Sequence, residues 1–267
     1  MNFNSYKGHF IRKCLGQHFL HDKKIISNMV DIINPKLDHI MVEIGPGLGS
    51  LTKKIVTNLK YITVIEIDYN LIVKLKKQLI LSSKLNILHQ NAMLVDFLKL
   101  SSEIGKPLRI FGNLPYNISI SFIFHMFNYV NIIKDMHFLL QKEVFLRLTA
   151  KPNVKYYNRL SIMSQCYFKI IKLLEVPNTS FIPMPKVESV MVKLIPNFPY
   201  FLNKEAYKLN KLLKYVFNQR RKILKNSLNK FFNIKELINY GINPNLRAEN
   251  LSIEQYCYLA KLLFKYH

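Results

Sequence analysis

The segment FGNLPYNIS (111–119) contains the residues best suited to chemistry in this chain of 267 residues. Asn113 offers an amide oxygen that can accept a hydrogen bond from an exocyclic amine. Pro115 makes the loop rigid and leaves neighbouring carbonyls, such as that of Leu114, free for a ligand. The ring of Tyr116 offers a flat face for a stacked base, a contact worth about 1–3 kcal/mol. This set predicts a site that holds the N6 amine of an adenine against a methyl donor; the alternative is a structural turn with a packed tyrosine.

A glycine-rich loop, EIGPGLG (43–49), lies between a β-rich run and a helical pattern. Glycines there let the backbone turn sharply and let a ligand lie against it. About twenty residues later the next β-rich run ends in Glu66-Ile-Asp68, where a carboxylate can accept both hydroxyls of a ribose. The two features predict an adenosine-bearing cofactor, and by themselves they do not separate NAD from S-adenosylmethionine.

The elements that must position these residues alternate between strand and helix patterns from about residue 40 to 141. This alternation predicts an α/β fold with a parallel sheet and helices on both faces. Ligands bind at the carboxyl ends of such strands, so the loop after the fourth strand should face the cofactor. The predicted strands are 39–45, 61–68, 85–90, 108–114 and 135–141, and the predicted helices are 50–59, 69–81 and 119–130.

The character of the chain changes near residues 197–202. Two further strands are predicted at 169–177 and 187–195, joined through the proline-rich segment FIPMP (181–185). The residues after 202 are basic and helical in pattern, with a break at GINP (241–244). We therefore predict a cofactor-binding domain at 1–199 and a small helical domain at 200–267.

Thirty-nine Lys and Arg against 16 Asp and Glu give a formal charge of +23. Because 32 of these residues are lysines, the codon drift of an AT-rich genome is one explanation of the excess. Placement is more informative: from 203 to 235 there are ten basic residues and one acidic residue. This run predicts contact with a polyanion, against the alternative of a solvated basic face. Its informative positions are Lys204, Lys208 and Lys211, at one-face helical spacing, and Arg220, Arg221 and Lys222.

Composition excludes several other classes of protein. A chain that is 49% hydrophobic and 12% aromatic can bury a core, which excludes a disordered polycation. Three widely spaced cysteines do not form a disulfide framework, and the scattered histidines predict no metal site. No apolar run reaches about 18 residues, and the N-terminus lacks a secretory signal pattern. We therefore expect no membrane contact and a cytoplasmic location.

These motifs together closely resemble the KsgA-type bacterial ribosomal RNA adenine N6-dimethyltransferases, which act on the small subunit. The resemblance covers about residues 7–264. The segments that carry it are RKCLGQHFL (12–20), VEIGPGLGSLT (42–52), VIEID (64–68), NAM (91–93), FGNLPYNIS (111–119), LQKEVFLRL (140–148), FIPMPKVESVMVKL (181–194), FNQRRKILKNSL (217–228) and RAENLSIEQY (247–256).

The resemblance implies a Rossmann-like class I S-adenosylmethionine-dependent methyltransferase sheet with a small all-helical C-terminal domain. It also implies an activity: transfer of methyl groups from S-adenosylmethionine to N6 of two adjacent adenosines in the 3′-terminal hairpin loop of 16S rRNA. The expected substrate is the 30S subunit or its precursor, and the expected enzyme is a monomer with a role in late subunit biogenesis. The target adenosine has to leave its stack to reach the site.

The resemblance also assigns roles to individual residues. In such enzymes the positions of His18 and Asn91 are expected to be Asn and Asp, so both are departures here. We hypothesise that Asn113 and the carbonyl of Leu114 or Pro115 accept the two N6 hydrogens, with the target base between Tyr116 and Phe181. The implied cofactor-binding residues are His18, Leu20, Gly45, Glu66, Asn91 and Asn113, and the implied rRNA-binding residues are Arg220, Arg221 and Lys222.

Three other functions remain open at this point. One is a large-subunit rRNA adenine methylase of the antibiotic-resistance type, which shares the glycine loop and the Asn-Leu-Pro-Tyr loop. A second is a ribosome-assembly factor in which methylation is secondary. The third is a nicotinamide oxidoreductase, which has no use for the Asn-Leu-Pro-Tyr loop.

Overall fold

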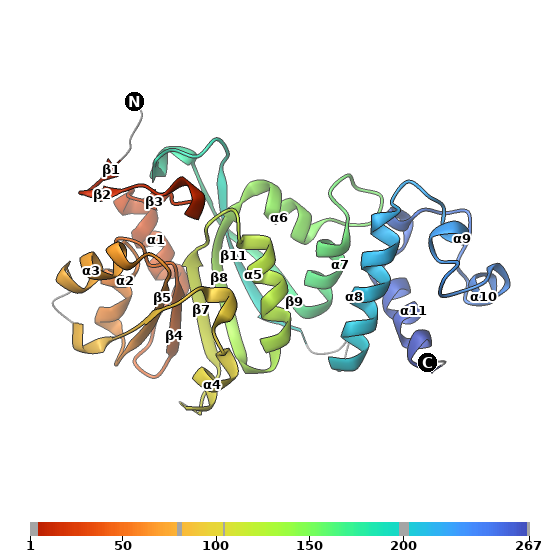
Figure 1. Cartoon of the computed structure of the whole chain (residues 1–267), viewed down its shortest axis with the longest axis horizontal. Helices are drawn as coiled ribbons and strands as arrows, with labels where there is room; N and C mark the ends of the chain where they lie inside the picture. The colour runs from red at the N-terminus through yellow and green to blue at the C-terminus, as the bar shows by residue number, and fades with distance from the viewer. Residues whose placement is uncertain (1–4, 79–81, 104, 198–202, 266–267) are drawn as a thin grey trace. The chain divides into compact units, whose positions relative to one another are not determined.

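The computed structural model of the chain describes residues 5–78, 82–103, 105–197 and 203–265 (Figure 1). Its contacts group the chain into two compact units. The first consists of Met1–Phe145 and Lys169–Pro196, and the second of Leu146–Phe168 and Asn197–His267. The division predicted at residues 199 and 200 differs from this grouping, because residues 146–168 belong to the second unit.

The first unit is built on a seven-stranded sheet with the order β6-β5-β4-β7-β8-β11-β9. The five strands from β6 to β8 are parallel to their neighbours, and β11 is antiparallel to β8. Each of the seven strands predicted from the sequence is present, so the predicted α/β sheet is confirmed. The bounds are β4 Ile40–Ile44, β5 Ile62–Glu66, β6 Leu85–His89, β7 Leu108–Asn113, β8 Ile133–Gln141, β9 Phe168–Val176 and β11 Ser189–Pro196.

Helices cover both faces of this sheet, as predicted (Figure 1). Buried residues of α1, α2 and α3 form one core with the side chains of Met41, Val64 and Phe111. On the opposite face Phe122 of α5 packs edge-on against Phe138 of β8. Because successive side chains of a strand point to opposite faces and both faces are covered, the central strands β4 and β5 are buried at every residue and mostly apolar. The helix bounds are α1 Lys23–Ile33, α2 Thr52–Ile55, α3 Tyr69–Gln78, α4 Phe97–Ser102 and α5 Ser119–Met126.

The predicted helices at 50–59 and 119–130 are shorter than expected. Each passes into a 3-10 helix, at Val56–Asn58 and at Phe127–Ile132. The helix predicted at 69–81 begins as expected, and its last three residues lie outside the described residues. Helix α1 was not predicted, although Asp22 caps it by accepting from two backbone N–H groups.

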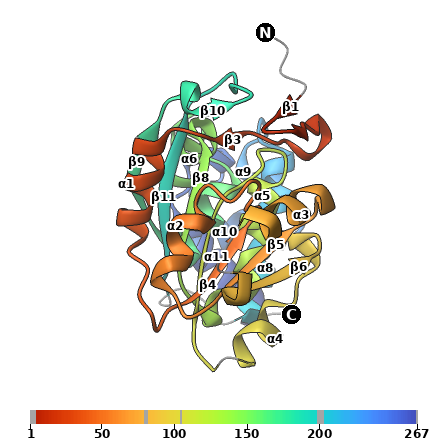
Figure 2. The ribbon, with the colours of Figure 1, turned by 90° about the vertical axis from the view of Figure 1, so that its left-hand side faces the viewer.

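The residues before α1 form an N-terminal arm made of very short elements. These are β1 Ser5–Tyr6, β2 His9–Phe10, a 3-10 turn at Lys13–Leu15, and β3 Phe19–Leu20. Strand β3 pairs antiparallel with β10, Phe181–Ile182, which follows β9 (Figure 2). This pairing joins the start of the chain to the FIPMP segment.

Among the described residues of the second unit, the regular secondary structure consists of helices joined by turns and loops, apart from Phe168, which begins β9, and one isolated β-bridge. Helix α7 is included in it because α7 packs against α8 and α11. The predicted break at 241–244 falls between α10 and α11. The bounds are α7 Arg159–Tyr167, α8 Asn203–Asn218, α9 Leu224–Ser227, α10 Ile234–Asn239 and α11 Ile253–Lys265, and α6 precedes them at Lys142–Thr149. Within the part of the chain that the structure describes, no helix has the length and apolar character needed to cross a membrane.

Candidate active site

A cavity of about 410 Å³ lies in the first unit, bordered by residues at the carboxyl ends of β4, β5 and β7. The strand order reverses at β4, which has β5 on one side and β7 on the other. Such switch points are where α/β sheets bind ligands, and the volume suits a ligand of nucleoside size. Nine of the predicted site residues line this cavity: His18, Leu20, Gly45, Glu66, Asn91, Asn113, Leu114, Pro115 and Tyr116.

The glycine loop forms one wall of the cavity with its backbone. Gly45 has a φ of 65° and donates its N–H to the carbonyl of Ile65 at 2.9 Å. Gly47 has a φ of 58°, and a Cβ at this position would lie 3.3 Å from the ring of Phe19. Both backbone conformations favour glycine, so the loop can approach a ligand without side chains in the way.

Glu66 ends β5 and is buried beside this loop. Its carboxylate accepts backbone N–H groups from Gly47 at 3.2 Å, Ile67 at 2.9 Å and Asp68 at 3.0 Å. Burial raises the pKa of this carboxyl, and the three hydrogen bonds oppose that rise. Two carboxylate oxygens have about four acceptor positions, so acceptor capacity is left for ribose hydroxyls.

Asn91, the predicted partner of the adenine amine, is the N-cap of a 3-10 turn at Ala92–Leu94. Its Oδ1 accepts the backbone N–H of Met93 at 3.0 Å. An amide oxygen has a second lone pair, so Asn91 can still accept from a cofactor amine. That role remains a prediction, and the capping bond explains why Asn can replace Asp at this position.

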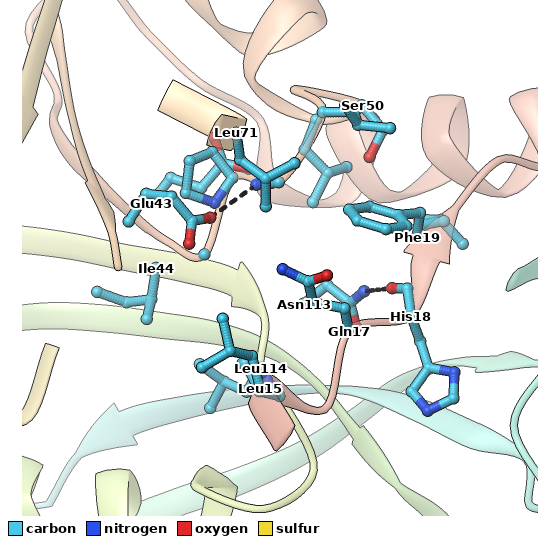
Figure 3. A pocket seen from close by; sticks show the side chains of 18 of the residues that line it. Leu15, Gln17, His18, Phe19, Glu43, Ile44, Ser50, Leu71, Asn113 and Leu114 are labelled. Atoms are coloured by element: carbon cyan, nitrogen blue, oxygen red, sulfur yellow. Dashed lines mark hydrogen bonds between the residues drawn. The ribbon is translucent and has the colours of Figure 1, made fainter. Parts of the chain in front are cut away.

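Asn113 is fixed in one orientation. Its Nδ2 donates to the backbone carbonyl of His18 at 2.8 Å (Figure 3). Because the nitrogen is committed to the arm, the amide oxygen is left to accept a hydrogen bond from a substrate. The side chain of Leu114 is buried and anchors the loop in the core. The carbonyl of Pro115 already accepts from the N–H groups of Ile118 and Ser119, so of the two predicted carbonyl acceptors we retain that of Leu114.

Tyr116 lies half-buried at the cavity, and its hydroxyl is hydrogen-bonded to Ser189 Oγ at 2.8 Å. Burial raises the pKa of this phenol. The ring of His18 stacks on Tyr116 with centroids 5.1 Å apart, and His18 Nδ1 donates to the carbonyl of Pro183 at 2.7 Å. Figure 3 shows this imidazole turned away from Phe19 and Asn113. The backbone carbonyl of His18 therefore holds Asn113, and the imidazole ring of His18 packs on Tyr116.

Phe181 is not at the cavity, which corrects the prediction that its ring stacks on the target base. It is only 2% exposed and packs in the core with Leu20 and Ile26. The reason is the pairing of β10 with β3, which sets Phe181 opposite Leu20.

The predicted basic residues differ in their surroundings within the second unit. Arg220 donates from Nε to Glu249 Oε2 at 2.8 Å and from Nη2 to the carbonyl of Lys155 at 3.0 Å. Lys208 donates to the carbonyl of Leu263 at 2.6 Å, so this lysine also holds the fold together. Arg221 and Lys222, by contrast, are exposed. The side chain of Lys204 lies outside the described residues.

Glu43 lines the cavity and was not singled out by the sequence analysis. It is buried on β4 beside Glu66, and Thr52 Oγ1 donates to its Oε2 at 2.6 Å. Burial raises its pKa from 4.5 to about 8, and the Thr52 hydrogen bond only partly opposes this rise. The sequence held a usable signal for this pair. Glu43 lies on the strand before the glycine loop and Thr52 begins the helix after it, and a tight loop brings these two positions together.

Glu43→Gln should remove a pH dependence of stability. Folded Glu43 keeps its proton up to about pH 8, whereas in the unfolded chain it loses the proton near 4.5. Its contribution is therefore fully present below the unfolded pKa and falls by about 1.4 kcal/mol per pH unit as the pH rises towards the folded pKa. Denaturant unfolding at pH 5, 6, 7 and 8 (about the range between the two values) measures this for both proteins. Parallel wild-type and variant curves would contradict it.

Within the described residues, no group of three or more His, Cys, Asp or Glu side chains could hold a metal ion.

Comparison with known proteins agrees with this geometry. The sequence model of one protein family, described as Ribosomal RNA adenine dimethylase, matches residues 8–265. A protein of Baumannia cicadellinicola subsp. Homalodisca coagulata, named Ribosomal RNA small subunit methyltransferase A, is 52% identical over 97% of this chain and 96% of its own length. The protein of the same name from Enterobacter sp. (strain 638) is 49% identical over 98% of this chain and 97% of its own length.

Two solved structures share the fold over most of the chain. A dimethyladenosine transferase from Plasmodium falciparum has a TM-score of 0.77 and 25% identity, covering 92% of this chain and 98% of that one. The 23S rRNA methyltransferase ErmE has a TM-score of 0.70 and 20% identity, covering 92% and 99%. The predicted class I methyltransferase fold is thereby confirmed.

Proposed function

The chain belongs to the ribosomal RNA adenine dimethylase family, and from that premise we propose that it transfers methyl groups from S-adenosylmethionine to N6 of two adjacent adenosines in the 3′-terminal hairpin loop of 16S rRNA. The observation that carries this proposal is the fixed amide of Asn113, whose nitrogen is bonded to the arm and whose oxygen is left for a substrate amine. The relatives named for the small subunit match nearly the whole chain, which supports the choice of 16S rRNA.

The residues around the cavity fit the proposed cofactor. The backbone of Gly45 and Gly47 makes room for the amino-acid end, the Glu66 carboxylate accepts from the ribose, and Asn91 accepts from the adenine amine. S-adenosylmethionine, when bound, supplies an electrophilic methyl group on a positively charged sulfur. The chain itself has to place the nucleophile in line with that group.

Adenine N6 is a weak nucleophile because its lone pair is delocalised into the ring. The amide oxygen of Asn113 and the carbonyl of Leu114 accept its two hydrogens, which turns the nitrogen towards tetrahedral geometry and directs its lone pair at the methyl group. The ring of Tyr116 holds the unstacked base in place. The nitrogen releases one proton for each methyl group that it gains, and that proton passes to water.

The second unit is proposed to bind rRNA phosphates through its exposed basic residues. Replacing Arg221 and Lys222 together by Gln should weaken binding to 30S subunits and reduce the slope of log affinity against log salt by about 1.4 to 1.8, the effect of two lost phosphate contacts. Arg220→Gln is the matched comparison, because Arg220 is paired with Glu249 and its loss should lower the stability of the unit instead. An unchanged salt slope in the double variant would assign these residues to a solvated surface.

The proposed function is tested by offering the enzyme labelled S-adenosylmethionine with 30S particles that lack the modification and, in a separate reaction, with large-subunit particles, followed by identification of the labelled nucleotide. Dimethyladenosine at two adjacent positions near the 3′ end of 16S rRNA is the expected product. Label in large-subunit rRNA instead would favour the antibiotic-resistance type of methylase, and no label in either would refute the activity. The same proposal places the enzyme in the cytoplasm and makes it a monomer. Light scattering on the purified protein tests the monomeric state.

A further inference from the structure

Asp68 is a completely buried carboxylate that the proposed mechanism does not use. It follows β5 two residues after Glu66, and its Oδ1 accepts the backbone N–H of Asn70 at 3.0 Å. It does not line the cavity. Its second oxygen, Oδ2, faces the N-terminal arm.

Three side chains of the arm converge on that oxygen. Gln17 Nε2 donates to Asp68 Oδ2 at 2.9 Å, Arg12 Nε lies 3.4 Å from it, and His9 Nε2 lies 3.5 Å from it. Gln17 also ties the arm to itself, because its Oε1 accepts the backbone N–H of Arg12 at 2.8 Å and lies 3.2 Å from His9 Nε2. We call Asp68, Gln17, Arg12 and His9 the arm latch.

The arm latch is joined to the cofactor cavity on both sides. Just beyond Gln17, residues 18–21 form a wall of the cavity, and the His18 carbonyl holds Asn113. On the other side, the backbone N–H of Asp68 donates to Glu66, the proposed ribose-binding carboxylate. A buried charged acceptor with several donors is costly to leave unpaired, so the closed position of the arm is favoured as long as the latch is intact.

We propose that Asp68 is a positioning residue that holds the N-terminal arm closed over the cofactor cavity and thereby sets the affinity for S-adenosylmethionine. The ligand in this inference rests on the proposed function, whereas the closure of the arm rests on the contacts alone. Asp68 acts through Gln17 and the residues that follow it. A change at Asp68 therefore affects cofactor binding more than the methyl transfer step.

The test replaces Asp68 by Asn, which keeps its size but removes the charge and one acceptor. The Kd for S-adenosylmethionine, measured by titration calorimetry, should rise about tenfold, the equivalent of one lost charged hydrogen bond. The KM for S-adenosylmethionine should rise by a similar factor, with kcat at saturating cofactor within about twofold of wild type. Trypsin should cut the variant faster than wild type after Arg12 and Lys13, because both side chains are already exposed and an arm released from Asp68 can unfold locally to fit the protease.

Two further variants keep the inference falsifiable. Gln17→Glu sets a second carboxylate against Asp68 and should also speed cleavage of the arm, even if Asp68→Asn folds poorly. Asp96→Asn is the matched control, since Asp96 is a helix N-cap in the same unit that accepts from Lys99 and has no bond to the arm; it should leave Kd and cleavage unchanged.

The outcomes separate the two proposals. Unchanged Kd and unchanged cleavage in Asp68→Asn and Gln17→Glu, with wild type binding S-adenosylmethionine normally, would overturn the arm latch alone. Wild type that binds no S-adenosylmethionine would overturn the proposed function, and the cleavage rates of the cofactor-free proteins would still decide whether the latch holds the arm.

Discussion

Asn113→Ala should lower the rate of methyl transfer about 10²–10³-fold, the usual cost of removing one preorganised polar group from a reaction centre. The structure gives the reason: the Asn113 nitrogen is held by the His18 carbonyl, so its oxygen is oriented before the substrate arrives. Alanine removes the acceptor for an N6 hydrogen and also the bond to the arm. The fold should survive, because Asn113 is the last residue of β7 and the neighbouring Leu114 still anchors the loop.

Single-turnover rates with saturating 30S particles and labelled cofactor measure this loss directly. Asn117→Ala is a matched control, since Asn117 also donates to an arm carbonyl, that of Cys14 at 3.1 Å, and is assigned no role toward the substrate. The control should keep its rate within about threefold of wild type, since only one exposed hydrogen bond is lost. Equal rates for Asn113→Ala and wild type would refute the proposed mechanism.

Normal assembly of 30S subunits with the inactive variant would show that a biogenesis role is independent of methylation.

The parts of the fold that were predictable are those whose own residues specify them. Strands β4 and β5 are buried along their whole length and mostly apolar because both of their faces are covered, and the glycine loop after β4 has residues that only a tight turn requires. The position of the Asn113–Tyr116 loop at the cavity was predictable as well, because loops after parallel strands lie at the ligand-binding edge of such a sheet. The chemical roles of its residues remain predictions. Local sequence is informative wherever burial and backbone conformation are decided locally.

Contacts between distant segments decided the rest. Strands β3 and β10 have two residues each, too few for any periodicity, and their pairing is what buries Phe181. Arg220 and Arg221 look equivalent in the sequence, and only the position of Glu249 assigns the first to the fold and leaves the second exposed. Helix α7 likewise belongs to the second unit because of what it packs against, a fact that its own residues do not reveal.

Glu66→Ala should raise the Kd for S-adenosylmethionine at least about 100-fold. Hydrogen bonds to a charged group contribute about 1.5–3 kcal/mol each, and two ribose hydroxyls are expected to donate to this carboxylate. The loss has a second part, because the N–H groups of Gly47, Ile67 and Asp68 lose their common acceptor and the glycine loop loses its fixed position. The Kd of Glu66→Gln should fall between those of wild type and Glu66→Ala. The Gln amide keeps one acceptor oxygen, but its nitrogen faces backbone N–H donors.

The ribose contact can be isolated by changing the ligand together with the protein. S-adenosylhomocysteine and its 2′-deoxy and 3′-deoxy analogues are titrated against wild type and Glu66→Ala, which forms a cycle in which the distortion of the glycine loop cancels. If Glu66 holds the ribose, each missing hydroxyl weakens binding to wild type and has little effect on binding to the variant. An equal loss in both proteins would mean that the hydroxyls bind elsewhere. The role of Glu66 would then be limited to fixing the loop at Gly47, and the Kd of Glu66→Ala would report on that loop alone.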